Sequence, residues 1–198
     1  MSACERNKAP ILEVLKQYLG PGRMLEIGSG TAEHALFFAP NFPELQWVTS
    51  DRILNHQLIS QSLKRAQIKN LHGPELLQIG VDDFPKGGFN FVFTANTLHI
   101  MSWKENKTLF KLLGKRLRVG ALVLIYGPFN YNGNFTSPSN ANFDQLLKQR
   151  DPKSGIRNYE DVVSNMKSAG FQIIDDHEMP ANNRTLVFQR LAYEKSQG

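Results

Sequence analysis

The fold is decided by the stretch Met24-Leu25-Glu26-Ile27-Gly28-Ser29-Gly30-Thr31-Ala32-Glu33-His34, an apolar strand candidate that runs into a glycine turn. A short helix candidate follows at 32–39. Glycines after a first strand let the backbone approach a ligand closely and direct N–H groups at it. The spacing Gly-x-Gly-x-Ala is one residue shorter than the dinucleotide fingerprint, whose third small position would be Glu33. Because an anion there would repel a pyrophosphate, the turn predicts a ligand site but disfavours NAD.

Outward from this turn, short apolar strand candidates alternate with amphipathic helices. The strand candidates are Met24–Ile27, Leu45–Ser50, Leu76–Val81, Phe89–Ala95 and Ala121–Tyr126. This alternation predicts right-handed βαβ units and a mostly parallel sheet with helices on both faces. Two further strand candidates, Phe171–Asp175 and Thr185–Leu191, are joined by only nine residues, which implies an antiparallel pair. The prediction is an α/β fold with seven strands and an antiparallel C-terminal strand.

Composition predicts one globular domain over 1–198, because 41% of the 198 residues are hydrophobic. Residues 127–157 interrupt the pattern with Asn, Gly, Ser and Pro, and are interpreted as a lid or insertion that contains a helix at 142–150. The longest apolar run has six residues, too short for a membrane helix, and no secretory leader is evident. We therefore expect a cytoplasmic protein without membrane contact. The single Cys4 and the scattered histidines indicate neither an intrachain disulfide nor a metal site.

The net charge of +5 favours anionic partners in general, but it is too small to indicate nucleic acid by itself. Four lysines recur at helical spacing opposite an apolar face: Lys104, Lys107, Lys111 and Lys115. They are interpreted either as the solvated face of an amphipathic helix or as a phosphate-binding stripe.

Carboxylates at the strand ends point to an adenosine-containing cation. Glu26 lies inside a core strand, where an unpaired charge is costly, so it needs either turn amides or a cationic ligand as partner. S-adenosylmethionine carries an ammonium and a sulfonium, and therefore suits Glu26 better than NAD does. Asp51 ends the second strand, where an acid accepts both ribose hydroxyls of an adenosine. After the third strand, either Asp82 or Asp83 is placed to receive the adenine amino group, unless both are solvated turn acids.

The end of the fourth strand carries Asn96 and His99. Asn96 is a candidate for binding the donor or positioning the acceptor. His99 is interpreted as a general base, since its ordinary pKa suits that task, or as a structural hydrogen-bonding group. No (N/D)-P-P-(Y/F), G-x-S-x-G, Walker A or H-E-x-x-H motif occurs, which argues against exocyclic amino methylation of bases and against common hydrolase, NTPase and zincin chemistry.

At this point the chain resembles class I S-adenosylmethionine-dependent methyltransferases. It is most similar to the group whose animal member is called methyltransferase-like protein twenty-six. The segments that carry the closer resemblance are Glu5-Arg6-Asn7-Lys8, Tyr126-Gly127-Pro128-Phe129, Ser139-Asn140, Arg150-Asp151-Pro152 with Gly155-Ile156-Arg157, and Met179-Pro180-Ala181-Asn182-Asn183. The resemblance implies a Rossmann-like fold and S-adenosylmethionine as cofactor, but it supplies no acceptor. Ala32 departs from the family's usual third glycine, and the family's acid after the third strand aligns with Gly80 or Asp82.

The residue patterns and the resemblance together predict the site. The donor-binding residues are predicted to be Glu26, Gly28, Ser29, Gly30, Thr31, His34, Asp51, Asp82, Asn96 and Lys8. The catalytic candidates are His99, Asn96 and Tyr126, and the acceptor-pocket candidates are Arg6, Asn7, Lys8, Tyr126, Asn182 and Asn183. Asn182 and Asn183 are equally well explained by a tight turn, since Asn tolerates positive φ. The expected function is methylation of a small molecule or accessible side chain. The alternatives are a non-catalytic donor-binding scaffold and an RNA-directed methyltransferase.

Overall fold

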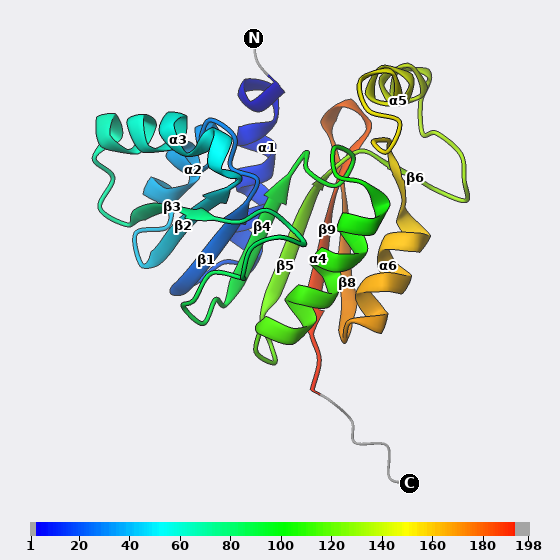
Figure 1. Ribbon diagram of the computed structural model, residues 1–198. Helices are drawn as coiled ribbons and strands as arrows, with labels where there is room; N and C mark the ends of the chain where they lie inside the picture. The colour runs from blue at the N-terminus through cyan, green and yellow to red at the C-terminus, as the bar shows by residue number, and fades with distance from the viewer. Residues whose placement is uncertain (1–2, 193–198) are drawn as a thin grey trace, which may run out of the picture.

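The computed structural model describes residues 3–192 and contains a seven-stranded sheet in the order β3-β2-β1-β4-β5-β9-β8 (Figure 1). Its strands are β1 (Gly22–Ile27), β2 (Leu45–Asp51), β3 (Leu71–Leu76), β4 (Phe91–Ala95), β5 (Leu122–Gly127), β8 (Phe171–Met179) and β9 (Asn183–Arg190). The first five strands are parallel, and β9 lies antiparallel between β5 and β8. The predicted fold class is confirmed.

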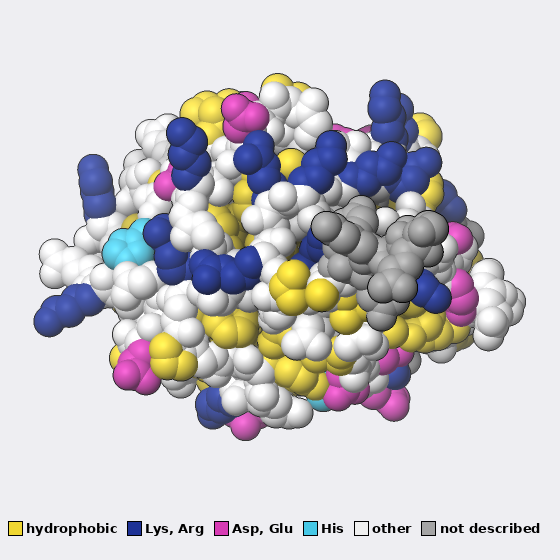
Figure 2. All heavy atoms as spheres, turned by 90° about the horizontal axis from the view of Figure 1, so that it is seen from below, with side chains coloured by type: hydrophobic (Ala, Val, Ile, Leu, Met, Phe, Trp, Pro, Cys, Tyr) yellow, Lys and Arg dark blue, Asp and Glu magenta, His cyan; other side chains and the backbone are white. Residues whose placement is uncertain are grey.

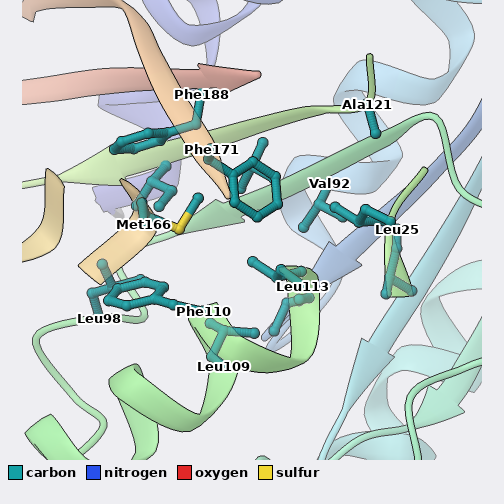
Figure 3. Close-up of a cluster of buried hydrophobic side chains, with 14 of the residues drawn as sticks. Leu25, Val92, Leu98, Leu109, Phe110, Leu113, Ala121, Met166, Phe171 and Phe188 are labelled. Atoms are coloured by element: carbon teal, nitrogen blue, oxygen red, sulfur yellow. The ribbon is translucent and has the colours of Figure 1, made fainter. Parts of the chain in front are cut away.

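Helices cover both faces of the sheet. α1 (Ala3–Tyr18), α2 (Glu33–Phe38), the 3-10 turn η1 (Ala39–Asn41) and α3 (Ile53–Ala66) pack on one face. α4 (Trp103–Arg116) and α6 (Tyr159–Ser168) pack on the other, where their apolar side chains meet β8 and β9 (Figure 3). Neighbouring residues of one strand alternate between the two cores, as Val123 and Leu124 of β5 do. This explains the continuous apolar runs that mark the central strands.

The third strand lies earlier in the chain than predicted. β3 spans Leu71–Leu76 instead of Leu76–Val81, and it contains Gly73 and Pro74. These two residues are typical of turns, but β3 is the outer strand of the sheet, where Pro is tolerated because one side has no ladder partner. The apolar character of the predicted segment comes from Leu77 and Ile79, which are buried in a loop.

The first helix begins at Ala3 and continues through Pro10. Glu5 to Lys8 are therefore helical, and α1 carries Arg6 and Asn7 to the edge of the sheet at which the parallel strands end (Figure 1).

Segment 127–157 lies at that same edge, and Leu147, Arg150, Asp151 and Ser154 of it line a cavity there. The segment contains β6 (Phe129–Asn130), which pairs with β7 (Arg157–Asn158), and α5 (Pro138–Arg150), four residues longer than predicted. Its end is fastened to the β4–α4 loop: Gly155 N–H donates to His99 O at 2.9 Å and Ser154 Oγ donates to Ile100 O at 2.8 Å. The Arg157 guanidinium donates to the carbonyls of Leu98 and Met101.

Within residues 3–192, no helix is both long and apolar enough to cross a bilayer, and no group of three His, Cys, Asp or Glu side chains could hold a metal ion. The single domain over 1–198 stays a prediction, and its first two and last six residues lie outside the described part.

Candidate functional site

A cavity of about 620 Å³ opens where β1, β2 and β4 end, at the edge where open α/β sheets bind ligands. Among its lining residues are six predicted site residues that the structure brings together around the glycine turn. These are Gly28, Ser29, Gly30, Thr31, His34 and Asp51, and Asn96 after β4 also lines the cavity.

The turn between β1 and α2 depends on two glycines in the left-handed region, Gly28 at φ 75° and Gly30 at φ 61°. The N–H groups of Gly28 and Ser29 both donate to Ser50 O of β2, at 3.0 and 3.1 Å. A Cβ at Gly28 would lie 2.9 Å from Thr97 Oγ1, whereas a Cβ at Gly30 would meet no atom within 4 Å. Gly28 therefore permits close packing against the β4 end, and Gly30 borders open space.

Asp51 connects the end of β2 to this turn. Its Oδ2 accepts from Gly30 N–H at 2.7 Å, and its Oδ1 accepts from Arg52 N–H at 2.7 Å. The side chain is buried but lines the cavity. Both oxygens are thus oriented by backbone groups and keep a second lone pair each for a ligand.

Glu26 lies below the turn and does not line the cavity. Its Oε2 accepts from Ser29 Oγ at 3.1 Å and from Trp47 Nε1 at 3.2 Å. Burial raises the pKa of Glu26 to about 7, although the two hydrogen bonds act in the opposite direction and lower it. Its partners are a hydroxyl and an indole, instead of the turn amides or cationic ligand considered from the sequence. Ser29 lines the cavity, and its hydrogen bond to Glu26 connects that buried carboxylate to the cavity.

A part of the cavity wall next to Asp51 was not predicted from the sequence. It consists of Leu77, Gln78 and Ile79, which follow β3. Asp82 was the predicted contact, but its carboxylate accepts from Gln78 N–H at 2.7 Å, and neither Asp82 nor Asp83 lines the cavity. Asp82 was predicted because the third strand was expected at 76–81. Gly73 and Pro74 are typical of turns and gave no indication that this strand begins at Leu71 and ends at Leu76.

A hydrogen-bonded chain extends from the cavity to Tyr126. His34 lines the cavity, and its Nε2 lies 2.9 Å from Asn7 Oδ1. Asn7 also hydrogen-bonds the Tyr126 hydroxyl, and both this bond and the nearby Arg6 lower the Tyr126 pKa, although burial raises it overall. Burial lowers the His34 pKa to about 4, so the ring is neutral at pH 7 and donates from Nε2 to Asn7. Asn7 therefore donates its N–H to Tyr126.

Asn96 connects these hydrogen-bonded side chains to the cavity. It lines the cavity at φ 57°, a left-handed conformation that Asn tolerates, and its N–H donates to Tyr126 O at 2.9 Å. The structure thus brings Asn7, His34, Asn96 and Tyr126 to one side of the site.

Three other predicted residues lie away from the cavity. Lys8 pairs with Glu5, and its Nζ lies 4.9 Å from the centroid of the Phe37 ring. Asn182, at φ 56°, and Asn183 form the turn between β8 and β9, where Asn183 Nδ2 donates to Pro180 O at 3.2 Å. The turn interpretation therefore accounts for both asparagines.

His99 is also absent from the cavity lining. It is 4% exposed, and its ring lies edge-on to Phe143 at 5.3 Å. Burial lowers its pKa to about 4, with a further contribution from Arg157. A general base works best with a pKa near the operating pH, so this environment favours a structural role.

The charge around the cavity is predominantly negative. Its described lining contains four carboxylates and two guanidinium groups: Glu33, Asp51, Glu105 and Asp151 against Arg52 and Arg150. By contrast, Figure 2 shows Lys and Arg side chains gathered on the opposite edge of the sheet, where α1, α4 and α6 end in basic turns. Cations at helix C-termini complement the helix dipole. The cavity therefore suits a ligand with positive charge.

Solved structures share this architecture. The S-adenosylmethionine-dependent methyltransferase SibL in its apo form is 22% identical with a TM-score of 0.80, over 96% of this chain and 56% of that chain. PigF with SAH is 13% identical with a TM-score of 0.81, over 94% and 56%. Human N-acetylserotonin methyltransferase in complex with SAM is 14% identical with a TM-score of 0.80, over 96% and 53%. The chain spans little more than half the length of these proteins.

At these identities the likeness establishes the fold, which is that of class I methyltransferases. A family model gives the relationship by sequence. Residues 1–190 match the family described as "Protein of unknown function (DUF938)", and the chain belongs to this DUF938 family.

Proposed function

We propose that this protein is an S-adenosylmethionine-dependent methyltransferase that acts on a small molecule or an accessible side chain. The observation that carries the proposal is the convergence of the glycine turn and the oriented Asp51 carboxylate on one cavity of about 620 Å³. Relatives in fold that were solved with SAM or SAH support the same ligand.

The residues present fit this cofactor. The second lone pairs of the Asp51 oxygens suit the two ribose hydroxyls, and the apolar side chains of Leu77, Ile79 and Met101 suit the adenine ring. The open space above Gly30 leaves room for the donor's chain. When bound, the donor supplies a methyl group on a sulfonium, and the excess of carboxylates around the cavity favours that cation over a pyrophosphate.

Tyr126 and Asn7 are buried behind the cavity lining, and are proposed to position the acceptor through Asn96 and His34, which line the cavity. Because its pKa is raised, the Tyr126 hydroxyl is protonated at pH 7, and because it accepts from Asn7, its own hydrogen is left to bind another group. It therefore does not serve as the base, and its proposed role is to hold Asn7 and Asn96 in position. Methyl transfer is an in-line displacement for which such positioning is the main requirement.

We also propose membership of the methyltransferase-like protein twenty-six group. The segments that carry this resemblance lie along one edge of the structure. Asn7 of the first segment contacts Tyr126 of the second, and Asn140 Nδ2 of α5 donates to Asn182 O in the β8–β9 turn at 3.1 Å.

A non-catalytic donor-binding scaffold is the second candidate, favoured by the buried, weakly basic His99. An RNA-directed enzyme is less well supported, because the basic side chains gather away from the cavity (Figure 2). Incubation with methyl-labelled S-adenosylmethionine and a metabolite extract, with and without ribonuclease, tests all three. Transfer to a small compound supports the proposed function, ribonuclease-sensitive transfer supports RNA, and binding without any transfer supports the scaffold.

A further inference from the structure

Arg150, the last residue of α5, is a charged group of the cavity lining that the fold itself does not use. Its side chain is exposed and lines the cavity of about 620 Å³. Within residues 3–192, its guanidinium has neither a hydrogen bond nor an ion pair. Two other basic side chains of the same segment do have partners: Lys148 Nζ lies 2.6 Å from Asp144 Oδ2, and Arg157 donates to carbonyls of the β4–α4 loop. Arg150 is thus a cation at the cavity that is available to a ligand.

Carboxylates that share the cavity with Arg150 are engaged by other groups. Glu105 Oε2 accepts from Ser102 N–H at 2.7 Å and from the Ser102 hydroxyl at 2.6 Å, in the cap of α4. Asp151 Oδ1 accepts from Lys153 N–H at 2.9 Å. Neither carboxylate lies within 4.0 Å of the Arg150 guanidinium, although both line the same cavity. The acidic side chains therefore favour the cationic donor, whereas the guanidinium is open to a separate anion.

The part of the chain that carries Arg150 is joined to the loop after β4. Ser154 Oγ donates to Ile100 O at 2.8 Å, and both residues line the cavity. Leu147, one turn before Arg150, adds a second apolar side chain to the same lining. Asn96, at the start of this loop, lines the cavity as well. The lining on this side thus combines a polar group at the end of β4, two aliphatic side chains and one guanidinium.

We propose that Arg150 binds a carboxylate of the methyl acceptor, so that the acceptor is a small monocarboxylic acid with an apolar body. This inference rests on the proposed function. A guanidinium matches a planar carboxylate through two parallel, charge-assisted hydrogen bonds. A phosphate monoester carries nearly two negative charges. The four carboxylates of the lining would therefore repel it more strongly than they repel a single carboxylate.

The carboxylate is the anchor of the acceptor and not the group that is methylated. Its lone pairs are occupied by the guanidinium, so a second, nucleophilic group of the acceptor reacts. That group forms the new bond to the methyl carbon with its own lone pair. The sulfur–methyl bond breaks with its electron pair left on sulfur, and the proton of the nucleophile passes to water. Arg150 contributes to this displacement by orienting the acceptor.

The charge of the labelled product tests the acceptor class. The protein is incubated with methyl-labelled S-adenosylmethionine and a metabolite extract, and the products are passed over an anion exchanger. A carboxylic acid has a pKa of about 4, so the labelled product should be retained at pH 7 and released at pH 2. A phosphate ester would still be retained at pH 2, and the cationic donor is not retained at all.

Arg150→Met tests the residue itself. It should lower the rate of label transfer at least tenfold, because charge-assisted hydrogen bonds are lost. The affinity for S-adenosylhomocysteine, measured by isothermal titration calorimetry, should stay that of the wild type. Lys153→Met is the matched control, since Lys153 is exposed, does not line the cavity and carries the same charge. This control should transfer label at the wild-type rate.

Three results would overturn this inference and leave the proposed function intact. The first is a labelled product that is neutral, cationic or still anionic at pH 2. The second is an Arg150→Met variant that transfers label as fast as the wild type. The third is an equal loss of S-adenosylhomocysteine affinity in this variant, which would assign Arg150 to the donor. Absence of any transfer by a wild-type protein that binds S-adenosylhomocysteine would overturn both proposals.

Discussion

The carboxylate of Asp51, at the end of β2, accepts a 2.7 Å hydrogen bond from the backbone N–H of Gly30 in the turn after β1. One side chain thus fixes both the turn and the position of its own oxygens. Since these oxygens line the cavity, backbone hydrogen bonds orient them toward the space in which a ribose would bind. Pre-organisation of this kind lowers the cost of binding.

Removal of this carboxylate should weaken donor binding. We predict that Asp51→Ala reduces the affinity for S-adenosylhomocysteine at least tenfold, or about 1.4 kcal/mol, measured by isothermal titration calorimetry. Asp83→Asn is the control, because Asp83 is exposed and does not line the cavity. Equal affinities for Asp51→Ala and the wild type would remove Asp51 from the site.

The two glycines of the turn should respond differently to alanine. At Gly28 the new methyl group would press against Thr97, so Gly28→Ala should destabilise the fold strongly. At Gly30 the cost is mainly the left-handed conformation, about 1–2 kcal/mol, while the methyl group enters space proposed for the donor. Thermal unfolding should rank Gly28→Ala as the less stable variant, and Gly30→Ala should lose donor affinity while it remains folded. The reverse order of stability would contradict the described turn.

Glu26 should make stability depend on pH. Its pKa is about 7 in the folded protein and near its ordinary value when unfolded, so the folded state binds the extra proton between these values. The stabilisation of the folded state by this proton is complete below about pH 4.5 and is lost as pH rises through 7. The free energy of unfolding of Glu26→Gln, relative to that of the wild type, should therefore rise by roughly 3 kcal/mol between pH 4.5 and 8. Urea unfolding at a series of pH values measures this difference. Parallel stability curves for the two proteins would show that the Glu26 pKa is not raised.

Arg157 should fasten the end of segment 127–157 to the β4–α4 loop beside the cavity. Its guanidinium satisfies the carbonyls of Leu98 and Met101, which Arg157→Met would leave without that donor. Lost charge-assisted bonds cost about 1–3 kcal/mol. Hydrogen exchange should become faster at 98–101 and 153–157 in this variant. The exposed Arg65→Met serves as control, and exchange that changes equally in both variants would refute the fastening role.

Much of the sheet follows from sequence because its central strands are buried on both faces. Val123 and Leu124 point to opposite cores, so β5 is a continuous apolar run, as is the first part of β4 with Val92 and Phe93. The outer strand β3 has no such signal, and Gly73 and Pro74 suggest a turn instead. Pro10 similarly suggests a boundary, although α1 passes through it.

Side-chain partners were less predictable because they come from distant parts of the chain. The burial of Glu26 follows from its place in a strand, but Trp47 and Ser29 as its partners do not. The contact of Asn7 with His34 and Tyr126 depends on where α1 begins. His99 has a suitable residue type and strand position for a base, yet its burial against Phe143 removes the basicity that this role requires.

Thermal unfolding with saturating S-adenosylmethionine, S-adenosylhomocysteine or NAD tests the central proposal most directly. A ligand at a hundred times its dissociation constant stabilises by roughly 2.7 kcal/mol, which raises the midpoint of a protein of this size by several degrees. We predict such a shift with the two sulfur ligands, none with NAD, and none with any ligand in Asp51→Ala. Unchanged midpoints with both sulfur ligands, or a shift with NAD alone, would contradict a methyl-donor site at the β1 glycine turn.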